Sequence, residues 1–361
     1  MLHVIGIWVL RVLAMRTMRL WWGMLVALVG LTAAAAAEEP ASYGAGTEGF
    51  VSEMVRRHGF DERELATFMG RARYSQEVMD AIRRPFEAKP WHKYRPIFLT
   101  DKRIQGGAAF WRENRGLLER AQAVYGVPPQ IIVAIIGVET NYGSNLGKRR
   151  VIDALSTLGF SYPKRADFFR KELEALLLLA REEPIDALEL RGSYAGAMGL
   201  PQFIPSSYRA YAVDFDGDGR RNLWKSKADA IGSVGNYFEQ HGWKAGEPVA
   251  LTTRVTDGVP RGIAPAGKRP VKPSISLDRL KAAGITADAH LPGSTRVTLI
   301  RLQAPEPEYW LGLENFYVIT RYNHSNLYAM AVYQLSREIR TAYEAEHEQQ
   351  ATADRSRDMR K

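Results

Sequence analysis

The amino-acid sequence predicts a mostly α-helical (α+β) protein with a small β-rich insertion, and three observations lead to this fold class. Apolar residues recur at helical spacing through residues 47–123. An unbroken apolar run, Ile131 to Val138, follows Pro128-Pro129, and proline is tolerated in the first turn of a helix. Residues 247–304 are rich in glycine and proline and contain short Val/Thr-rich runs, which are typical of strands.

The first 37 residues have the features of a secretory signal. Arg11, Arg16 and Arg19 precede an apolar run from Leu20 to Ala36, and small alanine residues around Ala37 provide a cleavage site. An uncleaved membrane anchor is the alternative, because roughly 18 apolar residues is near the minimum that spans a bilayer. Both interpretations predict an exported protein.

The composition excludes several kinds of function. The chain has no cysteine, which removes thiol nucleophiles, thiolate zinc sites, disulfides and the acylated cysteine of a lipoprotein. The net charge is +9, of which three positive residues lie in the signal, and such a basic excess suits a polyanionic partner. Export, together with the lack of any run of five or more basic residues, argues against nucleic acid as the partner.

Further helical patterns follow in order along the chain. Residues 171–181 are leucine-rich, residues 227–241 end at Gly242, and residues 314–343 return to helical spacing after the β-rich segment. Within that segment, Val249–Val255 and Arg296–Leu302 are the expected strands.

Glu139 is the first candidate for chemistry. It ends the apolar run and is followed by Thr140-Asn141-Tyr142-Gly143, a sequence typical of a helix-ending turn. A carboxyl group at the end of a buried helix is desolvated, which raises its pKa and lets it donate a proton near neutral pH. A glycosidic oxygen needs such a general acid when its bond is cleaved. A capping or salt-bridged glutamate is the structural alternative.

Small residues gather between Gly192 and Tyr208. Glycines at this density let a backbone approach a flat ligand closely, and Ser193 and Gln202 offer polar groups to sugar hydroxyls and acetamides. A tight crossing of helices that needs small side chains is the alternative interpretation.

Four segments, in one order between residues 90 and 335, resemble the membrane-bound lytic murein transglycosylase B family. They are residues 125–147 with Gly126-Val127-Pro128-Pro129 and Ile136-Gly137-Val138-Glu139-Thr140, then Tyr162-Pro163-Lys164-Arg165-Ala166, then Ser193-Tyr194-Ala195-Gly196-Ala197-Met198-Gly199 with Gln202-Phe203-Ile204-Pro205-Ser206, and finally Arg321-Tyr322-Asn323-His324-Ser325.

The resemblance implies a lysozyme-like catalytic core in the periplasm, which cleaves peptidoglycan between N-acetylmuramic acid and N-acetylglucosamine without water. The product is a 1,6-anhydromuramyl end, and no cofactor is expected for catalysis. Carried over by position, Glu139 is the catalytic acid/base, and the residues that line the glycan groove are Ser193, Gln202, Tyr237, Tyr322, Asn323, Arg165 and Tyr94. Many family members carry a lipid on a cysteine that this chain lacks.

Residues 214–222 match the first half of a calcium-binding loop. Asp214, Asp216 and Asp218 occupy positions 1, 3 and 5, a glycine occupies position 6, and Arg220 supplies the backbone carbonyl of position 7. Position 12 is a lysine, and the resemblance implies that Asp229 closes a longer loop instead. We therefore expect a structural Ca²⁺; an Asp/Gly-rich turn that binds nothing is the alternative.

The expected organisation divides the chain into consecutive parts. These are a signal peptide (1–37), an N-terminal helical region (38–120), the lysozyme-like core with its calcium-type loop at 214–229 (121–246), a small β-rich insertion (247–312), a helical region that completes the groove (313–345) and a polar tail (346–361). The expected partner is the peptidoglycan glycan strand, bound by a monomer; cell-wall synthesis proteins are further candidate partners.

Two other functions are compatible with parts of this pattern. A hydrolytic muramidase would need a second carboxylate to activate water or form a covalent intermediate. The nearest acid downstream of Glu139, Asp153, lies in the apolar stretch 151–158 and is predicted to be structural. A catalytically silent peptidoglycan-binding scaffold would not need Glu139 in its motif.

Overall fold

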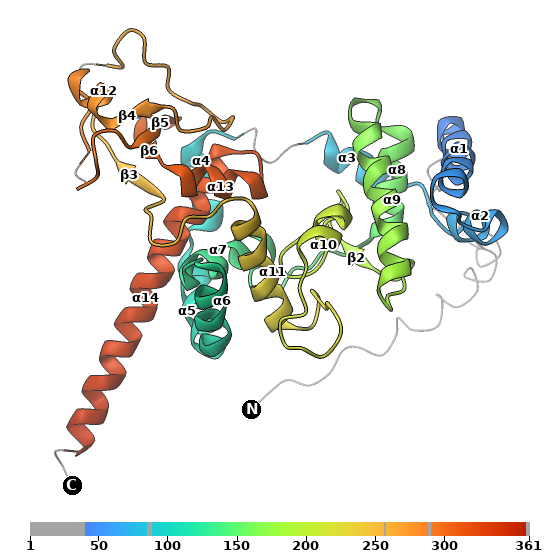
Figure 1. Ribbon diagram of the computed structural model, residues 1–361, viewed down its shortest axis with the longest axis horizontal. Coiled ribbons are helices and arrows are strands. Elements are labelled where there is room, and N and C mark those ends of the chain that lie inside the picture. The colour runs from blue at the N-terminus through green and yellow to red at the C-terminus, as the bar shows by residue number, and fades with distance from the viewer. Residues whose placement is uncertain (1–39, 85–88, 256–257, 288–289, 359–361) are drawn as a thin grey trace, which may run out of the picture. The chain divides into compact units, whose positions relative to one another are not determined.

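The computed structural model of the chain describes residues 40–84, 89–255, 258–287 and 290–358, with side chains described up to residue 348. The predicted signal peptide lies outside the described residues. The elements in order are α1 (Ala41–His58), α2 (Glu62–Met69), α3 (Gln76–Ile82), α4 (Trp91–Phe98), α5 (Asp101–Glu113), α6 (Arg115–Tyr125), α7 (Pro129–Thr140), β1 (Arg149–Arg150), α8 (Val151–Ser161), the 3-10 helix η2 (Pro163–Arg165), α9 (Ala166–Glu182), β2 (Arg191–Gly192), α10 (Pro205–Tyr211), α11 (Lys227–Gln240), β3 (Ala250–Thr252), β4 (Ile275–Ser276), α12 (Leu277–Ala282), β5 (Arg296–Leu302), β6 (Glu308–Gly312), α13 (Glu314–Tyr322) and α14 (Asn326–Asp358) (Figure 1).

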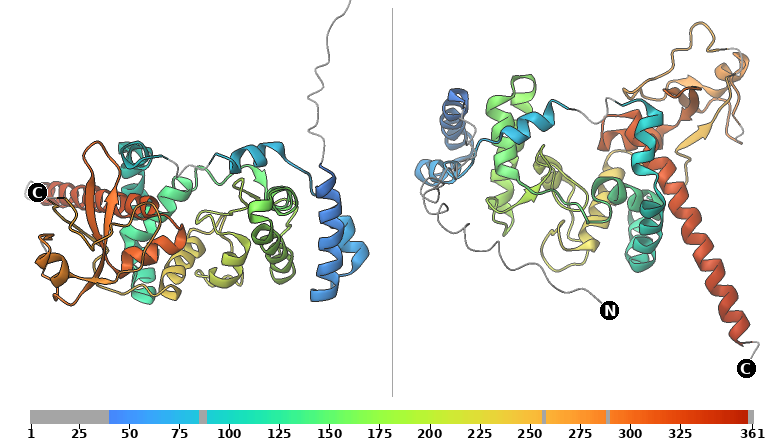
Figure 2. Two further views of the ribbon diagram at one scale, coloured as in Figure 1. Left: turned by 90° about the horizontal axis from the view of Figure 1, so that it is seen from above. Right: turned by 180° about the vertical axis from the view of Figure 1, so that it is seen from behind.

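The prediction of a mostly helical protein with one small β module is confirmed. Four strands form one antiparallel sheet in the order β3-β6-β5-β4, and all four fall within residues 247–312; the two-residue strands β1 and β2 pair separately. Both views of Figure 2 show these strands, in orange, gathered near the start of α14. The module has its own small core, in which Leu280, Val297, Leu299 and Leu311 are fully buried.

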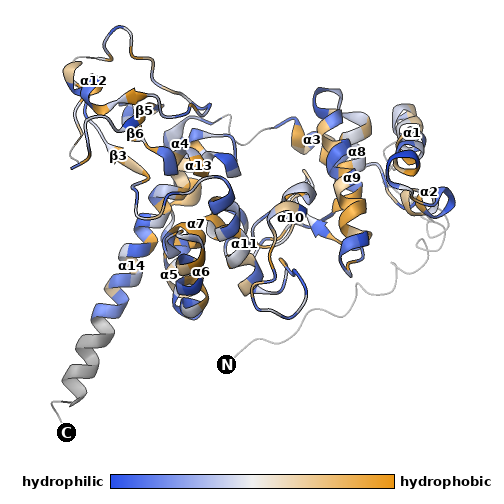
Figure 3. Cartoon of the chain, in the orientation of Figure 1, coloured by the Kyte–Doolittle hydropathy of each residue, from blue (hydrophilic) through white to orange (hydrophobic). Residues whose placement is uncertain are grey.

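Helix α7 lies at the centre of the main core. Pro128 precedes it and Pro129 opens it, as expected for residues whose fixed φ suits a helix start. Every residue from Ile131 to Gly137 is buried, and α7 packs against α5, α6, α11 and α14. Figure 3 shows the hydrophobic character concentrated on such inner helices. The choice of a helix over a strand for this apolar run is confirmed.

The N-terminal helices pack on the pair α8–α9. Helices α1 and α3 contact α8. A hydrogen bond of 2.8 Å between the hydroxyls of Tyr43 and Ser156 joins α1 to α8. Side-chain caps begin α2 and α3, where Asp61 accepts from the amide of Glu64 and Ser75 from that of Val78.

The segment 314–343, predicted as continuous helix, is broken at Asn323. This residue has an extended backbone (φ −139°, ψ 125°), so α13 ends at Tyr322. Ser325 then restarts the helix, because its Oγ accepts from the amide of Tyr328 at 3.3 Å. The new helix α14 continues to Asp358, through most of the segment predicted as a polar tail. The break separates Tyr322, the last residue of α13, from Tyr328 in the first turn of α14.

Among the described residues, no single helix is both long and apolar enough to cross a membrane; the bent pair α6 and α7, at 113°, passes that test only when taken together.

Candidate active site

Glu139 lies at the penultimate position of α7 and is partly buried. The turn after it is tightly constrained, because Asn141 and Tyr142 both have left-handed backbones (φ 48° and 60°). The phenol of Tyr142 packs against Gly137. A Cβ added at Gly137 would lie 2.6 Å from the phenol oxygen of Tyr142. A glycine two residues before Glu139 is therefore required by the turn that ends the helix.

Thr140 connects this turn to the glycine-rich segment, residues 192–208. Its hydroxyl contacts the carbonyl of Leu200 at 3.0 Å, and the amide of Gly143 donates to it at 3.1 Å. Two of the four segments noted in the sequence are thus hydrogen-bonded to each other directly beside Glu139.

Tyr328 on α14 contacts the candidate acid directly. Its phenol donates a hydrogen bond to Oε1 of Glu139 at 2.6 Å, and the tyrosine side chain is 3% exposed. Burial raises the pKa of Tyr328 well above its ordinary value, and the negative charge of Glu139 raises it further. The phenol therefore stays protonated and acts as a permanent donor. No sequence motif indicates Tyr328, which lies three residues, about one helical turn, after the Arg321–Ser325 motif.

Tyr322 lies between this pair and an open cavity. Its ring is nearly parallel to that of Tyr328, with centroids 6.4 Å apart, and the charge of Glu139 contributes to its raised pKa after the larger effect of burial. Its hydroxyl donates to the carbonyl of Pro201 at 2.5 Å. The ring of Tyr322 therefore lines the cavity on one side and lies near the carboxylate of Glu139 on the other.

The cavity has a volume of about 990 Å³ and brings together five of the seven predicted groove residues. Helices α9, α10 and α11, the glycine-rich segment and the break after α13 supply its walls. The predicted residues on these walls are Arg165, Gln202, Tyr237, Tyr322 and Asn323.

Aromatic rings form one wall of this cavity. Tyr237 lies 4.8 Å from Tyr322 between ring centroids and stacks on His241 at 4.0 Å. The Tyr237 phenol is held in place because it donates to the carbonyl of Arg321 at 2.7 Å. Flat, fixed rings of this kind suit the apolar faces of sugars.

Gln202 has a constrained backbone at the cavity wall. Its φ of 51° is left-handed, which is uncommon for a residue other than glycine and often marks a functional position. Its side-chain amide donates to the carbonyls of Gly199 at 2.9 Å and Leu146 at 3.3 Å.

The nearby glycines serve packing within the protein. An added Cβ at Gly196 would lie 2.4 Å from Leu155, and one at Gly199 would lie 2.7 Å from Leu223. For these two glycines the structural interpretation holds, although Gly196 packs as a turn residue against helix α8 and Gly199 against a loop, and neither lies at a crossing of two helices.

Two predicted groove residues lie off the cavity wall. Ser193 closes its own turn, since its Oγ accepts from the amides of Ala195 and Ala197 at 3.2 and 3.1 Å. Tyr94 is 1% exposed, packs against Phe98, and contributes electrostatically to the raised pKa of Tyr328. The structure thus places Tyr94 in the core behind Tyr328, and its role as a sugar contact stays a prediction.

Basic side chains, and no carboxylates, face the cavity. Among the described residues, its lining includes Arg165, Arg321, His241 and His324 but no aspartate or glutamate. Burial lowers the pKa of His324, and its electrostatic interactions with Arg321, Arg165 and His241 lower it further. Nε of Arg321 is buried without a hydrogen-bond partner in the described part of the chain. The cavity is therefore suited to an anionic ligand.

The acid predicted to be structural, Asp153, is structural. Its carboxylate accepts a hydrogen bond from the amide of Arg73 at 2.9 Å and forms an ion pair with Arg150 at 3.5 Å. These contacts connect α8 to the segment before α3. Another carboxylate, Glu172 on α9, is 4% exposed and binds the amide and hydroxyl of Ser206 at 2.9 and 2.7 Å. Burial raises the pKa of Glu172 above its ordinary value. It fastens the start of α10 to α9, two walls of the cavity.

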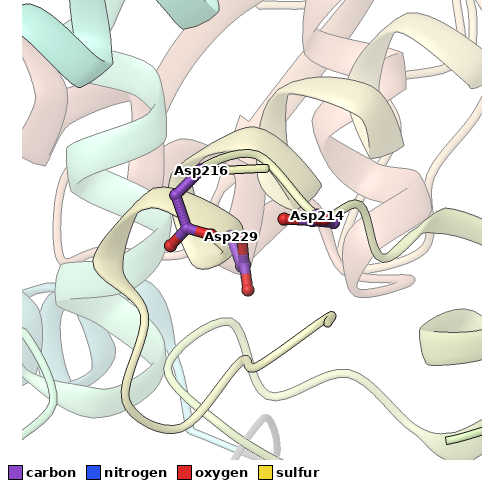
Figure 4. A group of neighbouring side chains, drawn as sticks. All are labelled: Asp214, Asp216 and Asp229. Atoms are coloured by element: carbon purple, nitrogen blue, oxygen red, sulfur yellow. The ribbon is translucent and has the colours of Figure 1, made fainter. Parts of the chain in front are cut away.

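Three aspartates of the predicted calcium loop converge. Carboxylate oxygens of Asp214, Asp216 and Asp229 all lie within 4.8 Å of one another, and Figure 4 shows them around a common space. Calcium–oxygen bonds of about 2.5 Å allow oxygens to sit up to roughly 5 Å apart, so this donor set fits Ca²⁺. The carboxylate of Asp218 instead accepts from the amide of Arg220 at 2.9 Å. The roles of Asp218 and of the Arg220 carbonyl stay predictions.

The loop is already organised by its own backbone. Desolvation would raise the pKa of Asp214, but hydrogen bonds from the amides of Gly219, Gly217 and Asp218 outweigh it and lower that pKa below its ordinary value. Asp229 is fully buried and accepts from the amides of Phe215 and Asn222 at 2.8 and 2.6 Å. It lies in the first turn of α11, the helix that carries Tyr237 to the cavity.

Comparison with known proteins identifies the family of this chain. The family model described as "Transglycosylase SLT domain" matches residues 43–337, and this chain belongs to that family. It is 47% identical over 304 residues to the membrane-bound lytic murein transglycosylase B of Escherichia coli K12, covering 81% of this chain and 82% of that protein.

Solved structures show the same fold. A soluble lytic transglycosylase SltB1 from Pseudomonas aeruginosa is 54% identical with a TM-score of 0.76, covering 82% of this chain and 98% of that one. The E. coli lytic transglycosylase Slt35, in complex with calcium, is 45% identical with a TM-score of 0.75, covering 82% and 93%. The expected lysozyme-like core is confirmed by these matches.

Proposed function

We propose that this protein is a peptidoglycan lytic transglycosylase that cleaves the β-1,4 bond between N-acetylmuramic acid and N-acetylglucosamine, with Glu139 as its single acid/base. The observation that carries the proposal is the pairing of Glu139 with a buried tyrosine donor, next to a cavity whose described lining holds no aspartate or glutamate. A hydrolase with two carboxylates would need that second group.

The proposed reaction uses Glu139 twice. Its protonated carboxyl first gives its proton to the glycosidic oxygen, and the bond from that oxygen to the muramyl anomeric carbon breaks. The resulting carboxylate then takes the proton of the muramyl 6-hydroxyl while that oxygen bonds to the anomeric carbon. No water is consumed, and Glu139 ends protonated as it began. An intramolecular nucleophile held in place has a large effective molarity and competes well against water.

The cavity residues supply binding and orientation. The rings of Tyr237 and Tyr322 offer flat surfaces to the sugars, and Gln202 and Asn323 offer amides to hydroxyl and acetamide groups. Tyr328 acts on Glu139 as a positioning residue, because its hydrogen bond fixes the orientation of the carboxyl group. The muramyl acetamide is suited to stabilise positive charge at the anomeric carbon between the two steps.

Calcium would serve stability and not proton transfer. Slt35, the related E. coli enzyme, was solved with calcium, and the three converging aspartates of this chain have the oxygen ligands that this ion prefers. Asp214, Asp216 and Asp229 would hold the ion and tie residues 214–222 to the start of α11.

A location in the cell envelope is supported by the relative of 47% identity, which is described as membrane-bound. The finer proposal is a periplasmic location reached through the N-terminal signal, with peptidoglycan glycan strands as the partner.

Analysis of the released products tests the reaction. Purified sacculi digested in heavy-oxygen water should yield muropeptides with anhydro ends, which lack one water relative to hydrolytic products and carry no label at the new end. Reducing ends that contain solvent oxygen as the main product would identify a hydrolase instead.

A further inference from the structure

A second cavity, separate from the first, lies between α4, β6 and α14. Its volume is about 350 Å³, and it shares no lining residue with the cavity beside Glu139. Its lining includes Arg95, Glu308, Trp310, Gln334 and Arg337. The proposed cleavage reaction uses none of them.

Two guanidinium groups face this cavity without a neutralising partner. Nε of Arg95 donates to Oε1 of Gln334 at 2.7 Å, and Gln334 is only 9% exposed, so the arginine is anchored to a buried amide. Arg337 lies against the ring of Tyr333 at 6.0 Å. Among the side chains that the structure describes, no carboxylate lies within ion-pairing distance of either arginine. By contrast Arg340, on the same helix, pairs with Glu344 at 2.7 Å.

Glu308 provides a fixed negative group in the same cavity. Its two oxygens accept from two indole N–H groups, that of Trp91 at 3.2 Å and that of Trp310 at 3.5 Å. An ionised carboxylate has about four acceptor positions, so two rigid indoles orient it without exhausting it. In the described part of the chain Glu308 has no ion pair, and neither has Glu338, which also lines the cavity.

The cavity continues toward the edge of the small sheet. A neighbouring cavity of about 610 Å³ shares Glu308 and Trp310 with it and runs along residues 252–255. Strand β3 is an edge strand, because the sheet order is β3-β6-β5-β4. An edge strand presents backbone donors and acceptors that an extended peptide can use. Beyond Thr252 the hydroxyl of Thr253 and the amide of Arg254 donate to the carbonyl of Thr286, so this wall is partly paired within the protein. The charged groups at the Glu308 end are therefore the feature that points to a peptide.

We propose that these two cavities bind a peptide that carries free carboxylate and free ammonium groups, namely the stem peptide of a peptidoglycan strand, at a site separate from the cleavage site. Arg95 and Arg337 hold its carboxylates, and Glu308 and Glu338 hold its ammonium group. The choice of ligand rests on the proposed function, whereas the site rests on the contacts above. Such a site would hold the enzyme on the wall through peptides that the cleavage reaction does not touch.

Direct binding of the free stem pentapeptide, released from its glycan, tests the proposal. The full chain carrying Glu139→Gln is titrated by calorimetry, so that turnover plays no part. The double variant Arg95→Gln/Arg337→Gln should weaken binding at least about tenfold, as expected for loss of charge-assisted hydrogen bonds. Arg340→Gln, the matched control, should leave binding unchanged. Arg337→Gln alone tests the same point without disturbing the bond between Arg95 and Gln334.

Two further probes separate this site from the active site. A pentapeptide with amidated carboxylates should bind at least about tenfold more weakly than the free acid. An anhydro-disaccharide without peptide should not displace the pentapeptide. No measurable binding, equal binding by the double variant, or displacement by the disaccharide would each overturn the proposal. Failure of the proposed function would show separately, as an absence of anhydro ends when wild-type protein digests sacculi.

Discussion

The phenol of Tyr328 donates a hydrogen bond to Oε1 of Glu139 at 2.6 Å, although 189 positions separate the two residues in the chain. The contact forms because α14 packs along α7, and both residues lie on the facing surfaces of these helices. A neutral, buried donor fixes the orientation of the carboxyl group without adding a competing charge.

Glu139→Gln should abolish lysis of sacculi while leaving the fold and glycan binding nearly intact. The substitution is close to isosteric and removes only the transferable proton, so we expect the rate to fall by several orders of magnitude. The measurements are turbidity loss of sacculi and the melting temperature. Activity at even about a tenth of wild type would contradict the role assigned to Glu139.

Tyr328→Phe should lower kcat by about 10- to 150-fold, because a hydrogen bond to a charged group is worth about 1.5–3 kcal/mol. KM should change little, since the phenol contacts the acid and does not line the cavity. Tyr333→Phe is the matched control: it removes a phenol on the same helix that donates to the carbonyl of Ala250 at 2.9 Å. If both variants lose activity in proportion to their melting temperatures, the role of Tyr328 is structural.

Calcium should raise the melting temperature of the wild-type protein, and Asp214→Ala or Asp216→Ala should remove that increase. A ligand that binds only the native state stabilises it by about 2.7 kcal/mol at one hundred times its dissociation constant. Asp101→Asn, at an exposed helix start away from the loop, should respond to calcium as wild type does. Identical melting curves in calcium and in chelator would show that residues 214–222 are a plain turn.

His324 should titrate below its ordinary pKa of about 6.5, because burial and the charges of Arg321, Arg165 and His241 disfavour its protonated form. Between the two pKa values the unfolded chain binds more protons than the folded one, so stability should rise with pH through that window and be flat above it. Proton NMR should show the pKa of His324 rise in Arg321→Gln and on binding of an anionic muropeptide. A pKa at or above 6.5 in the free wild-type protein would refute this electrostatic account of the cavity.

The parts of the site that follow from local sequence were predictable. Two leading prolines and an unbroken apolar run identify α7, and they place Glu139 at its end. Arg165, Gln202 and Tyr322 were found through motifs, and the fold does bring them to one cavity. The β module was predictable because its glycines, prolines and Val/Thr runs differ from the helical sequence around it.

The rest depends on contacts between distant segments. Nothing near Tyr328 in the sequence indicates that its phenol meets a carboxylate on α7, and only the packing of α14 reveals it. Burial of Tyr94 behind Tyr328 likewise depends on how α4 packs against α14. The strand expected at residues 249–255 is shorter, because the amide of Arg254 turns away to the carbonyl of Thr286.

The break between α13 and α14 makes the length of residues 323–325 critical. The first helix ends with Tyr322, which lines the cavity. The next helix carries Tyr328, whose phenol donates a hydrogen bond to Glu139. Each residue of an α-helix turns the following ones by about 100°. One residue inserted or deleted here would rotate Tyr328 away from the acid or shift Tyr322 and Asn323 along the cavity wall. A change in the number of residues here should therefore be tolerated less well than a substitution, because residues 323–325 act as a spacer that sets Tyr322 and Tyr328 relative to Glu139.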